Sequence, residues 1–502
     1  MDNLMPSARR EHPRGGLSSA RDFVAPGRSD VLKTLAMRRW LLSAAGASML
    51  LAALIAGRAL RARATHPGPL PVPTPSLAVS VAAGGDLERP EPPARLADPT
   101  PPIARLELTR IAALDGSLIA PAAGGTARLT LDADLQRTAG SLMALRRLPE
   151  AAVVLMEVAT GRLLVYASHV ERGPARDLCA EASAPSASVF KIVTAAALVE
   201  DAHLGPETKQ CYSGGEQRIL AGDLIDDPRR DKWCTTLAGA LGRSVNTVFA
   251  RLAEHHLVPE QLDAMARKFG YGEPLPFDVP VQPSAVNVPN ESLEFARTAA
   301  GFWNTTLSPL EAAEISAIVA RGGERVRPSL VDKILAKSGD VLWSSPDGSD
   351  SGRAIAQDTA EKLAAMMEHT ISEGTSFRAF HDARGTAFLP GIAVAGKTGT
   401  LADAPARRYF TWFTGFAPVR PIQHVPQVAI AVLVVNGPSW RVKANGLARD
   451  VLRSYFASRE VKGVTSPVLS ISSRSGVGDQ GEERPVVARH SLHSKRVGAL
   501  AK

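Results

Sequence analysis

The sequence has few aromatic residues and few cysteines. Phenylalanine, tryptophan and tyrosine make up 5% of its 502 residues, and there are only 3 cysteines. No basic stripe interleaved with aromatic residues is present, so we expect no nucleic-acid partner. No cysteine–histidine spacing matches a zinc site, and His255 and His256 are interpreted as a pair on a helix surface. We therefore predict no metal and no other cofactor. The formal charge of +8 is modest for this length.

One apolar run near the start is long enough to span a membrane. Residues 40–57 read WLLSAAGASMLLAALIAG and carry no charge, which is close to the minimum length of a transmembrane helix. Basic residues are more frequent before the run than after it, so we expect a single-pass anchor. Residues 1–39 are then a cytoplasmic basic arm, and the chain after the anchor is exported. A cleaved signal peptide is the alternative, because Ala62-Arg63-Ala64 has the small-x-small form of a cleavage site.

The composition divides the exported part into three segments. Residues 58–105 are rich in proline and small residues, which are unable to bury enough apolar surface to fold, so they are interpreted as a linker. Residues 106–457 alternate periodic apolar patterns with turn signals and are predicted to form one large domain. Residues 458–502 are polar without a periodic apolar face and are expected to be a disordered tail.

Three cysteines in an exported domain permit one disulfide. Cys211 and Cys234 are the better pair, because a bond between them would clamp the loop that contains the charged stretch 223–232. Cys179 would remain as a free thiol. Three reduced cysteines are an equally weighted alternative.

Helices and strands within 106–457 follow from periodicity. Residues 135–148 have a helical pattern, and 152–158 with 163–167 read as a β-hairpin. Residues 188–199 are apolar on nearly all sides, which predicts a helix through the interior, and a helix-rich stretch follows to about residue 270. A helix opens at 309, strands are expected over 409–417 and 427–435, and a helix over 447–456. Strands at both ends of a helical middle predict an α+β fold: an antiparallel sheet flanked by helices, with a helical subdomain.

Three short motifs occur in order. They are Ser188-x-x-Lys191, Ser244-x-Asn246 and Lys397-Thr398-Gly399-Thr400. Ser188 is the candidate nucleophile, because i, i+3 spacing places the amine of Lys191 on the same helix face. Apolar neighbours would lower the pKa of that amine and allow it to act as the base.

The second and third motifs are assigned to proton transfer and substrate binding. Ser244 would relay a proton between Lys191 and the leaving amine, and Asn246 would offer its amide to a substrate carbonyl. Lys397, Thr398 and Thr400 suit a terminal carboxylate, and Gly399 would let the ligand approach the strand. Backbone N–H groups of Ser188 and Thr400 are the expected oxyanion-hole donors.

Together these residues resemble the transpeptidase domain of penicillin-binding proteins over about residues 129–456. The resemblance implies a β-lactamase/transpeptidase-like fold and an acyl-serine intermediate formed from D-Ala-D-Ala stem peptides. It also implies peptidoglycan cross-linking, covalent inhibition by β-lactam antibiotics, and a place outside the bacterial cytoplasmic (inner) membrane.

The sequence departs from that family in two places. Ala187 stands where many members have glycine before the nucleophile. The segment between the anchor and the domain is also too short and proline-rich for a glycosyltransferase or a pedestal domain, so polymerisation of glycan strands is not expected.

Other functions are compatible with the same motifs. A D,D-carboxypeptidase is the first alternative, because the choice between water and an amine acceptor depends on groove shape rather than on motifs. A β-lactamase fits the membrane anchor less well, and a β-lactam sensor fits the single membrane span less well. The intact motifs argue against an inactive scaffold.

Overall fold

The computed structural model describes residues 106–215, 218–346, 350–403, 407–438 and 442–467. The predicted arm (1–39), membrane anchor (40–57) and linker (58–105) lie outside the described residues, as does the tail beyond 467. None of the helices in the described ranges is long and apolar enough to cross a membrane. The chain continues to pack past the predicted end of the domain, because Val464 is buried against the core.

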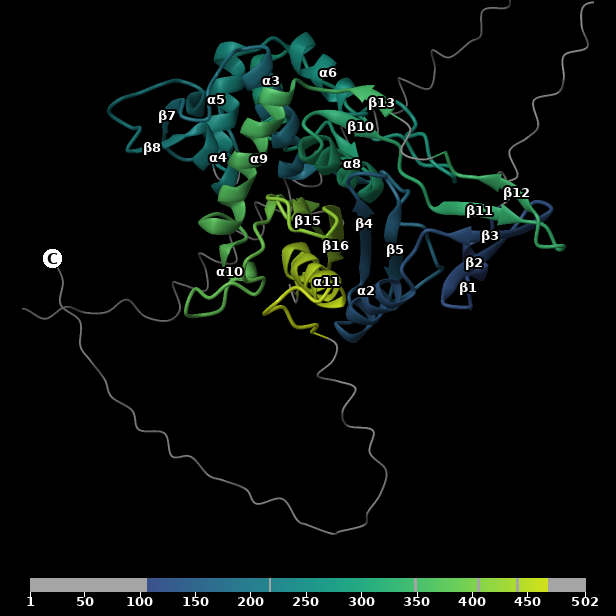
Figure 1. Ribbon diagram of the computed structural model, residues 1–502. Coiled ribbons are helices and arrows are strands. Elements are labelled where there is room, and N and C mark those ends of the chain that lie inside the picture. Colours follow the sequence, from purple (N-terminus) through teal and green to yellow (C-terminus); the bar gives the residue numbers. More distant parts are fainter. Residues whose placement is uncertain (1–105, 216–217, 347–349, 404–406, 439–441, 468–502) are drawn as a thin grey trace, which may run out of the picture. The chain divides into compact units, whose positions relative to one another are not determined.

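A five-stranded antiparallel sheet forms the centre of the domain (Figure 1). Its strands, in spatial order, are β14 (Ala395–Asp403), β15 (Arg408–Ala417), β16 (Val428–Asn436), β4 (Glu150–Glu157) and β5 (Leu163–Val170). The hairpin expected over 152–167 is β4–β5, and the two strands expected near the C-terminus are β15 and β16. These predictions are confirmed.

Both faces of this sheet are covered, which explains why its central strands are apolar without alternation. In β16 the residues Ala429 and Ala431 belong to one core cluster, whereas Val428 and Ile430 belong to the other. Helices α2 (Ala133–Leu145) and α11 (Ala444–Ser458) cover one face, and α8 (Pro309–Ala320) covers the other. The predicted helices over 135–148, from 309 and over 447–456 correspond to these three.

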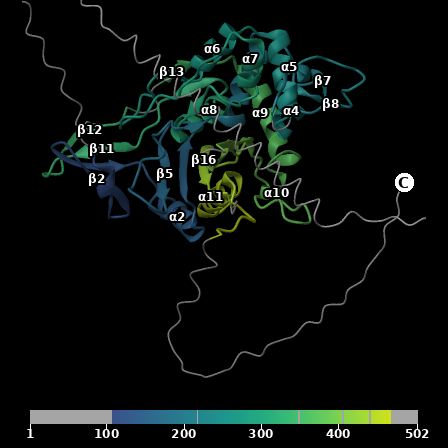
Figure 2. The same ribbon diagram turned by 180° about the vertical axis from the view of Figure 1, so that it is seen from behind.

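Most of the remaining helices gather beyond α8 (Figures 1 and 2). They are α3 (Lys191–Glu200), α4 (Leu237–Arg243), α5 (Asn246–His256), α6 (Pro259–Lys268), α7 (Ser292–Ala299) and α9 (Gln357–Ser372). The short helix α10 (Phe377–Phe380) instead packs against α11. The 3-10 turns are η2 (Leu108–Arg110), η3 (Ala187–Phe190) and η4 (Ala221–Asp223). The helix expected over 188–199 is divided into η3 and α3. It lies in the interior as predicted, because every residue from Lys191 to Val199 is buried.

Smaller sheets complete the fold. A second five-stranded sheet contains β1 (Ala112–Leu114), β2 (Ser117–Ala122), β3 (Gly125–Leu129), β11 (Val331–Leu335) and β12 (Val341–Ser344). The two-stranded pairs are β6 (Ala184–Pro185) with β9 (Thr306–Leu307), β7 (Lys209–Tyr212) with β8 (Trp233–Thr236), and β10 (Glu324–Val326) with β13 (Asp350–Arg353).

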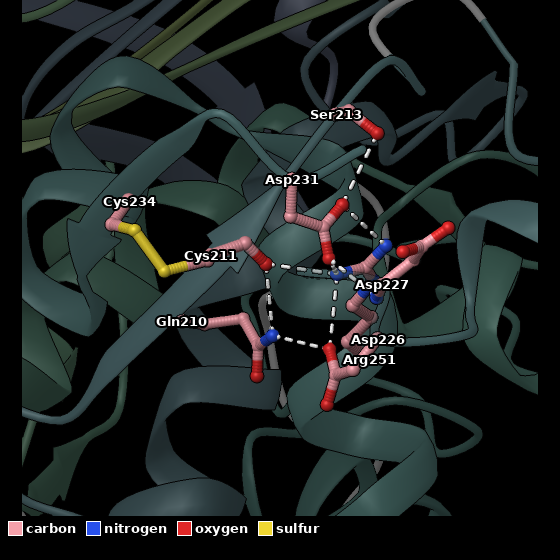
Figure 3. The surroundings of a disulfide bond; sticks show 8 residues. All are labelled: Gln210, Cys211, Ser213, Asp226, Asp227, Asp231, Cys234 and Arg251. Atoms are coloured by element: carbon pink, nitrogen blue, oxygen red, sulfur yellow. Dashed lines mark hydrogen bonds and ion pairs between the residues drawn. A yellow bond between two sulfur atoms is a disulfide. The ribbon is translucent and has the colours of Figure 1, made fainter. Parts of the chain in front are cut away.

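A disulfide joins Cys211 in β7 to Cys234 in β8, which is one of the two alternatives that the sequence left open. Figure 3 shows that the enclosed loop folds around the guanidinium of Arg251 from α5. Arg251 is fully buried and donates to Asp231 at 2.5 Å, to Asp226 at 3.0 Å and to the Cys211 carbonyl at 2.9 Å. Cys179 is a free, buried thiol.

Candidate active site

The three sequence motifs meet at one cavity of about 650 Å³. Its walls come from η3, the α4–α5 junction, the loops after α7 and α9, strands β14 and β15, and the start of α11. The lining residues are Ser188, Ser244, Asn246, Gly301, Phe302, Thr375, Thr398, Gly399, Thr400, Leu401, Ala402, Thr411, Trp412, Lys443 and Asn445.

Lys191 links the first motif to the second. Its Nζ donates to Ser188 Oγ at 2.8 Å and to Asn246 Oδ1 at 2.7 Å. A third bond, at 2.5 Å, goes to the Ala300 carbonyl in the loop after α7. The predicted nucleophile and base are therefore in direct contact, and three different segments fix the amine.

Burial keeps the pKa of Lys191 well below the usual lysine value. The side chain is fully buried, so desolvation disfavours the ammonium, and the nearby positive charge of Lys397 lowers the pKa further. A lysine with this environment is neutral over a wider pH range than an exposed one. It can then accept the proton of Ser188 Oγ when that oxygen attacks an electrophile.

Ser244 is bonded to the lysine of the third motif. It ends α4 with a φ of +59°, and α5 begins two residues later at Asn246. In this left-handed turn its Oγ accepts a hydrogen bond from Lys397 Nζ at 2.9 Å. Lys397 is fully buried and also donates to the Thr398 carbonyl at 2.7 Å. Desolvation lowers the pKa of Lys397 to about 7.

The alternation of β14 separates the residues of the third motif. Lys397 pairs with Thr414, whose hydroxyl donates to a carbonyl of α8, so Lys397 lies on the α8 face of the sheet. Thr398 pairs with Phe413, which packs in the core beneath α11, and Thr400 shares that opposite face. The ammonium of Lys397 is directed to Ser244, which lines the same cavity as Thr398 and Thr400. That Lys397 and the two threonines bind one carboxylate stays a prediction.

Gly399 also faces the α8 side. A Cβ at this position would stand 3.1 Å from Trp412 Cβ and 3.2 Å from Ala187 Cβ. Glycine is needed here for the close approach of β14 to the turn that carries Ser188, in addition to any approach of a ligand. Ala187 itself has a φ of +49°, a backbone conformation in which glycine is favoured.

Sequence reasoning missed Thr375 and the loop at Gly301. Thr375 lies in the loop after α9, and its Oγ1 is 2.6 Å from Thr398 Oγ1. A Cβ at Gly301 would stand 2.4 Å from the Ala187 carbonyl. Neither residue lies in a periodic or recognisable pattern, because tertiary packing alone brings them to the cavity.

In the part of the chain that the structure describes, no group of three or more histidine, cysteine or carboxylate side chains is arranged to hold a metal ion. The expectation for the oxyanion donors, the backbone N–H groups of Ser188 and Thr400, stays a prediction.

Comparison with known proteins identifies the family. A family model for the penicillin binding protein transpeptidase domain matches residues 151–453, which is more than half of the chain. The chain belongs to this family. The transpeptidase-domain fold expected from the three motifs is thereby confirmed.

Relatives and solved structures agree with this membership. Over 273 residues the chain is 32% identical to peptidoglycan D,D-transpeptidase PbpA from Mycobacterium tuberculosis, with 52% of each chain covered. The transpeptidase-family chain thus spans about half the length of the curated relatives it matches. The D,D-transpeptidase domain of a peptidoglycan glycosyltransferase from Eggerthella lenta aligns with a TM-score of 0.54 and 25% identity over 67% of this chain and 83% of that one.

A penicillin G acyl-enzyme complex of penicillin-binding protein A from M. tuberculosis shares the fold. It aligns with a TM-score of 0.52 and 24% identity over 68% of this chain and 81% of that one.

Proposed function

We propose that the chain is a membrane-anchored serine D,D-transpeptidase that cross-links peptidoglycan stem peptides and is acylated by β-lactams at Ser188. The observation that best supports this proposal is the 2.8 Å contact between Lys191 Nζ and Ser188 Oγ at the cavity. A buried amine of lowered pKa beside a serine hydroxyl is the arrangement that activates a serine for acyl transfer.

In the proposed acylation step, each proton transfer is assigned to a residue of the site. Ser188 Oγ attacks the carbonyl carbon of the D-Ala-D-Ala peptide bond while Lys191 takes the hydroxyl proton. The negative charge that develops on the carbonyl oxygen is stabilised by the backbone N–H groups of Ser188 and Thr400. The C–N bond then breaks, and the departing D-alanine amine receives a proton from Ser244, which Lys397 restores through its 2.9 Å hydrogen bond.

Deacylation determines the product. An amine of a second stem peptide attacks the acyl carbon of the Ser188 ester and gives a proton through Ser244 to Lys397. The new amide bond forms, the C–O ester bond breaks, and Lys191 returns the proton to Ser188 Oγ. Water as the attacking group would release a shortened peptide instead, which is the carboxypeptidase reaction. Both reactions use the same acyl-enzyme, so the acceptor has to be tested directly.

The donor carboxylate is assigned to hydroxyl groups. Thr398 and Thr400 lie on one face of β14, and Thr375 adds a third hydroxyl 2.6 Å from that of Thr398. Neutral donors that converge on one place suit an anionic C-terminus. Lys397 approaches the same cavity from the α8 side through Ser244, beside the proton-transfer groups.

A labelled penicillin tests the nucleophile. We expect covalent labelling of the exported fragment, loss of labelling in Ser188→Ala, and acylation slowed by roughly 10²–10⁴-fold in Lys191→Ala. Labelling that survives Ser188→Ala would refute the assignment. A stem-peptide donor, incubated with and without an amine acceptor, then separates the two reactions: cross-linked product supports the transpeptidase, and peptide shortening alone supports the carboxypeptidase.

The location is proposed from the sequence of residues 1–57. An uncleaved anchor at 40–57 leaves the catalytic domain outside the cytoplasmic membrane. Protease added to spheroplasts should digest the domain and spare the N-terminal arm. Protection of the whole chain contradicts this orientation, and a mature N-terminus near Thr65 would instead establish signal cleavage.

A further inference from the structure

Among the described residues that line the cavity containing Ser188, one is charged. Hydroxyl and amide side chains supply most of its polar lining, and no aspartate or glutamate is among the described lining residues. Lys443 is the exception, and its side chain is exposed. Lys191 and Lys397 are fully buried behind the cavity and are bonded to Ser188 and Ser244.

The start of α11 places Lys443 at the Thr400 end of the cavity. Thr411 in β15 lies directly opposite Thr400 in β14. Its Oγ1 accepts a hydrogen bond at 3.2 Å from the backbone N–H of Ala444, the first residue of α11. Lys443 is the residue immediately before Ala444, so this contact fixes its backbone next to the strand position opposite Thr400.

A second contact fixes the same segment from the other side. Asn445 is buried and donates through Nδ2 to Ser376 Oγ at 3.2 Å. Ser376 follows Thr375, whose hydroxyl is 2.6 Å from that of Thr398. The turn that carries Lys443 is therefore bonded to Thr411, opposite Thr400, and to Ser376, which follows the residue that contacts Thr398.

We propose that Lys443 is a specificity-determining residue that attracts the terminal carboxylate of the donor, or of a penicillin, to the hydroxyls of Thr398 and Thr400. This inference rests on the proposed function. It adds an exposed positive charge at the rim to the buried amine of Lys397, which is bonded to Ser244 in the cavity wall. An exposed cation at the rim acts mainly on the rate of encounter, and salt weakens its effect.

The test compares second-order acylation rates of the exported fragment with a penicillin and with its carboxylate ester. Lys443→Gln should slow acylation by the penicillin roughly two- to fivefold at low salt, the range for an exposed charge pair. Lys443→Glu should slow it further, and Lys443→Arg should keep the wild-type rate. Acylation by the ester should be nearly the same in all four proteins.

Salt and a remote lysine provide the controls. Raising the salt concentration should reduce the penicillin rate of the wild type towards that of Lys443→Gln. Lys337 is an exposed lysine in the turn between β11 and β12, in the second sheet, so Lys337→Gln makes the same change in net charge away from the cavity. It should leave both rates unchanged.

The outcomes separate this inference from the proposed function. If Lys443→Gln, Lys337→Gln and the wild type are acylated by the penicillin at equal rates, the role of Lys443 is refuted while the acyl-serine function stands. If Lys443→Gln slows penicillin and ester by the same factor, the residue supports the local fold rather than the carboxylate, and the inference is again refuted. A wild type that no penicillin labels refutes the proposed function itself.

Discussion

Replacing Lys397 by methionine should stabilise the protein, and more at acidic than at alkaline pH. Lys397 is fully buried, and desolvation lowers its pKa from 10.5 to about 7. Methionine fills a similar volume without a charge to desolvate. We expect the substitution to impair acylation at the same time, because Ser244 loses its hydrogen-bond donor.

The dependence on pH follows from proton binding. Between the folded pKa of about 7 and the unfolded value of 10.5, the unfolded chain binds more protons at Lys397 than the folded protein does. The free energy of unfolding therefore rises with pH across this window, and the destabilisation by Lys397 is fully present below about pH 7. From about pH 6 to about pH 9 this contribution changes by about 3 kcal/mol.

Urea unfolding of the wild type and of Lys397→Met, at about pH 6 and about pH 9, measures this change in the free energy of unfolding. The stability gained in Lys397→Met should be about 3 kcal/mol larger at about pH 6 than at about pH 9, because packing effects cancel in the comparison. Loss of the neighbouring charge also raises the pKa of Lys191 towards its usual value. This change likewise makes the stability gained in Lys397→Met larger at low pH than at high pH. A stability difference that does not vary with pH would show that Lys397 is not desolvated in the folded protein.

Two further substitutions test the disulfide-bonded loop and the close packing of β14. Arg251→Ala leaves the buried carboxylate of Asp231 without its ion-pair partner and should lower the free energy of unfolding by about 3–5 kcal/mol in urea titrations. Adding Asp231→Leu should recover part of the lost free energy. A loss below about 1 kcal/mol in Arg251→Ala would contradict a stabilising role of this ion pair. Gly399→Ala places a methyl group 3.1 Å from Trp412 Cβ and 3.2 Å from Ala187 Cβ, which should cost about 1–3 kcal/mol. Ala187→Gly should reduce that cost, and an equal cost in both backgrounds would mean that the strand moves away instead.

The sequence predicted the main elements because their periodicity reports burial directly. The strand expected over 427–435 is apolar without alternation, as a strand covered on both faces should be, and β16 is the middle strand of its sheet. The three motifs also predicted correctly that Ser188, Lys191 and Asn246 come together, although 55 positions separate Lys191 from Asn246. The order of the motifs in a known family predicts this long-range contact, whereas periodicity predicts only local structure.

The side-chain directions in the third motif were less accessible from sequence. Lys397 and Thr398 are adjacent in the motif, but adjacent side chains of a β-strand point to opposite faces of the sheet. Which face meets the cavity depends on the packing of β14 between η3 and the loop after α9. Thr375 and Lys443 reach the cavity from loops without periodic pattern, so nothing in the sequence distinguishes them from other threonines and lysines.

The two buried lysines have different tasks because their environments differ. Two desolvated ammonium groups so close together are unfavourable, so the pair holds fewer than two protons near neutral pH. Lys191, whose pKa is lowered by burial and by Lys397, is then the group able to take the proton of Ser188. Lys397, with a pKa of about 7, retains a proton in part of the molecules and can return one through Ser244. In the proposed mechanism both amines take part in proton transfer. Lys443, the charged residue among the described lining residues of the cavity, would add positive charge for a carboxylate at Thr398 and Thr400.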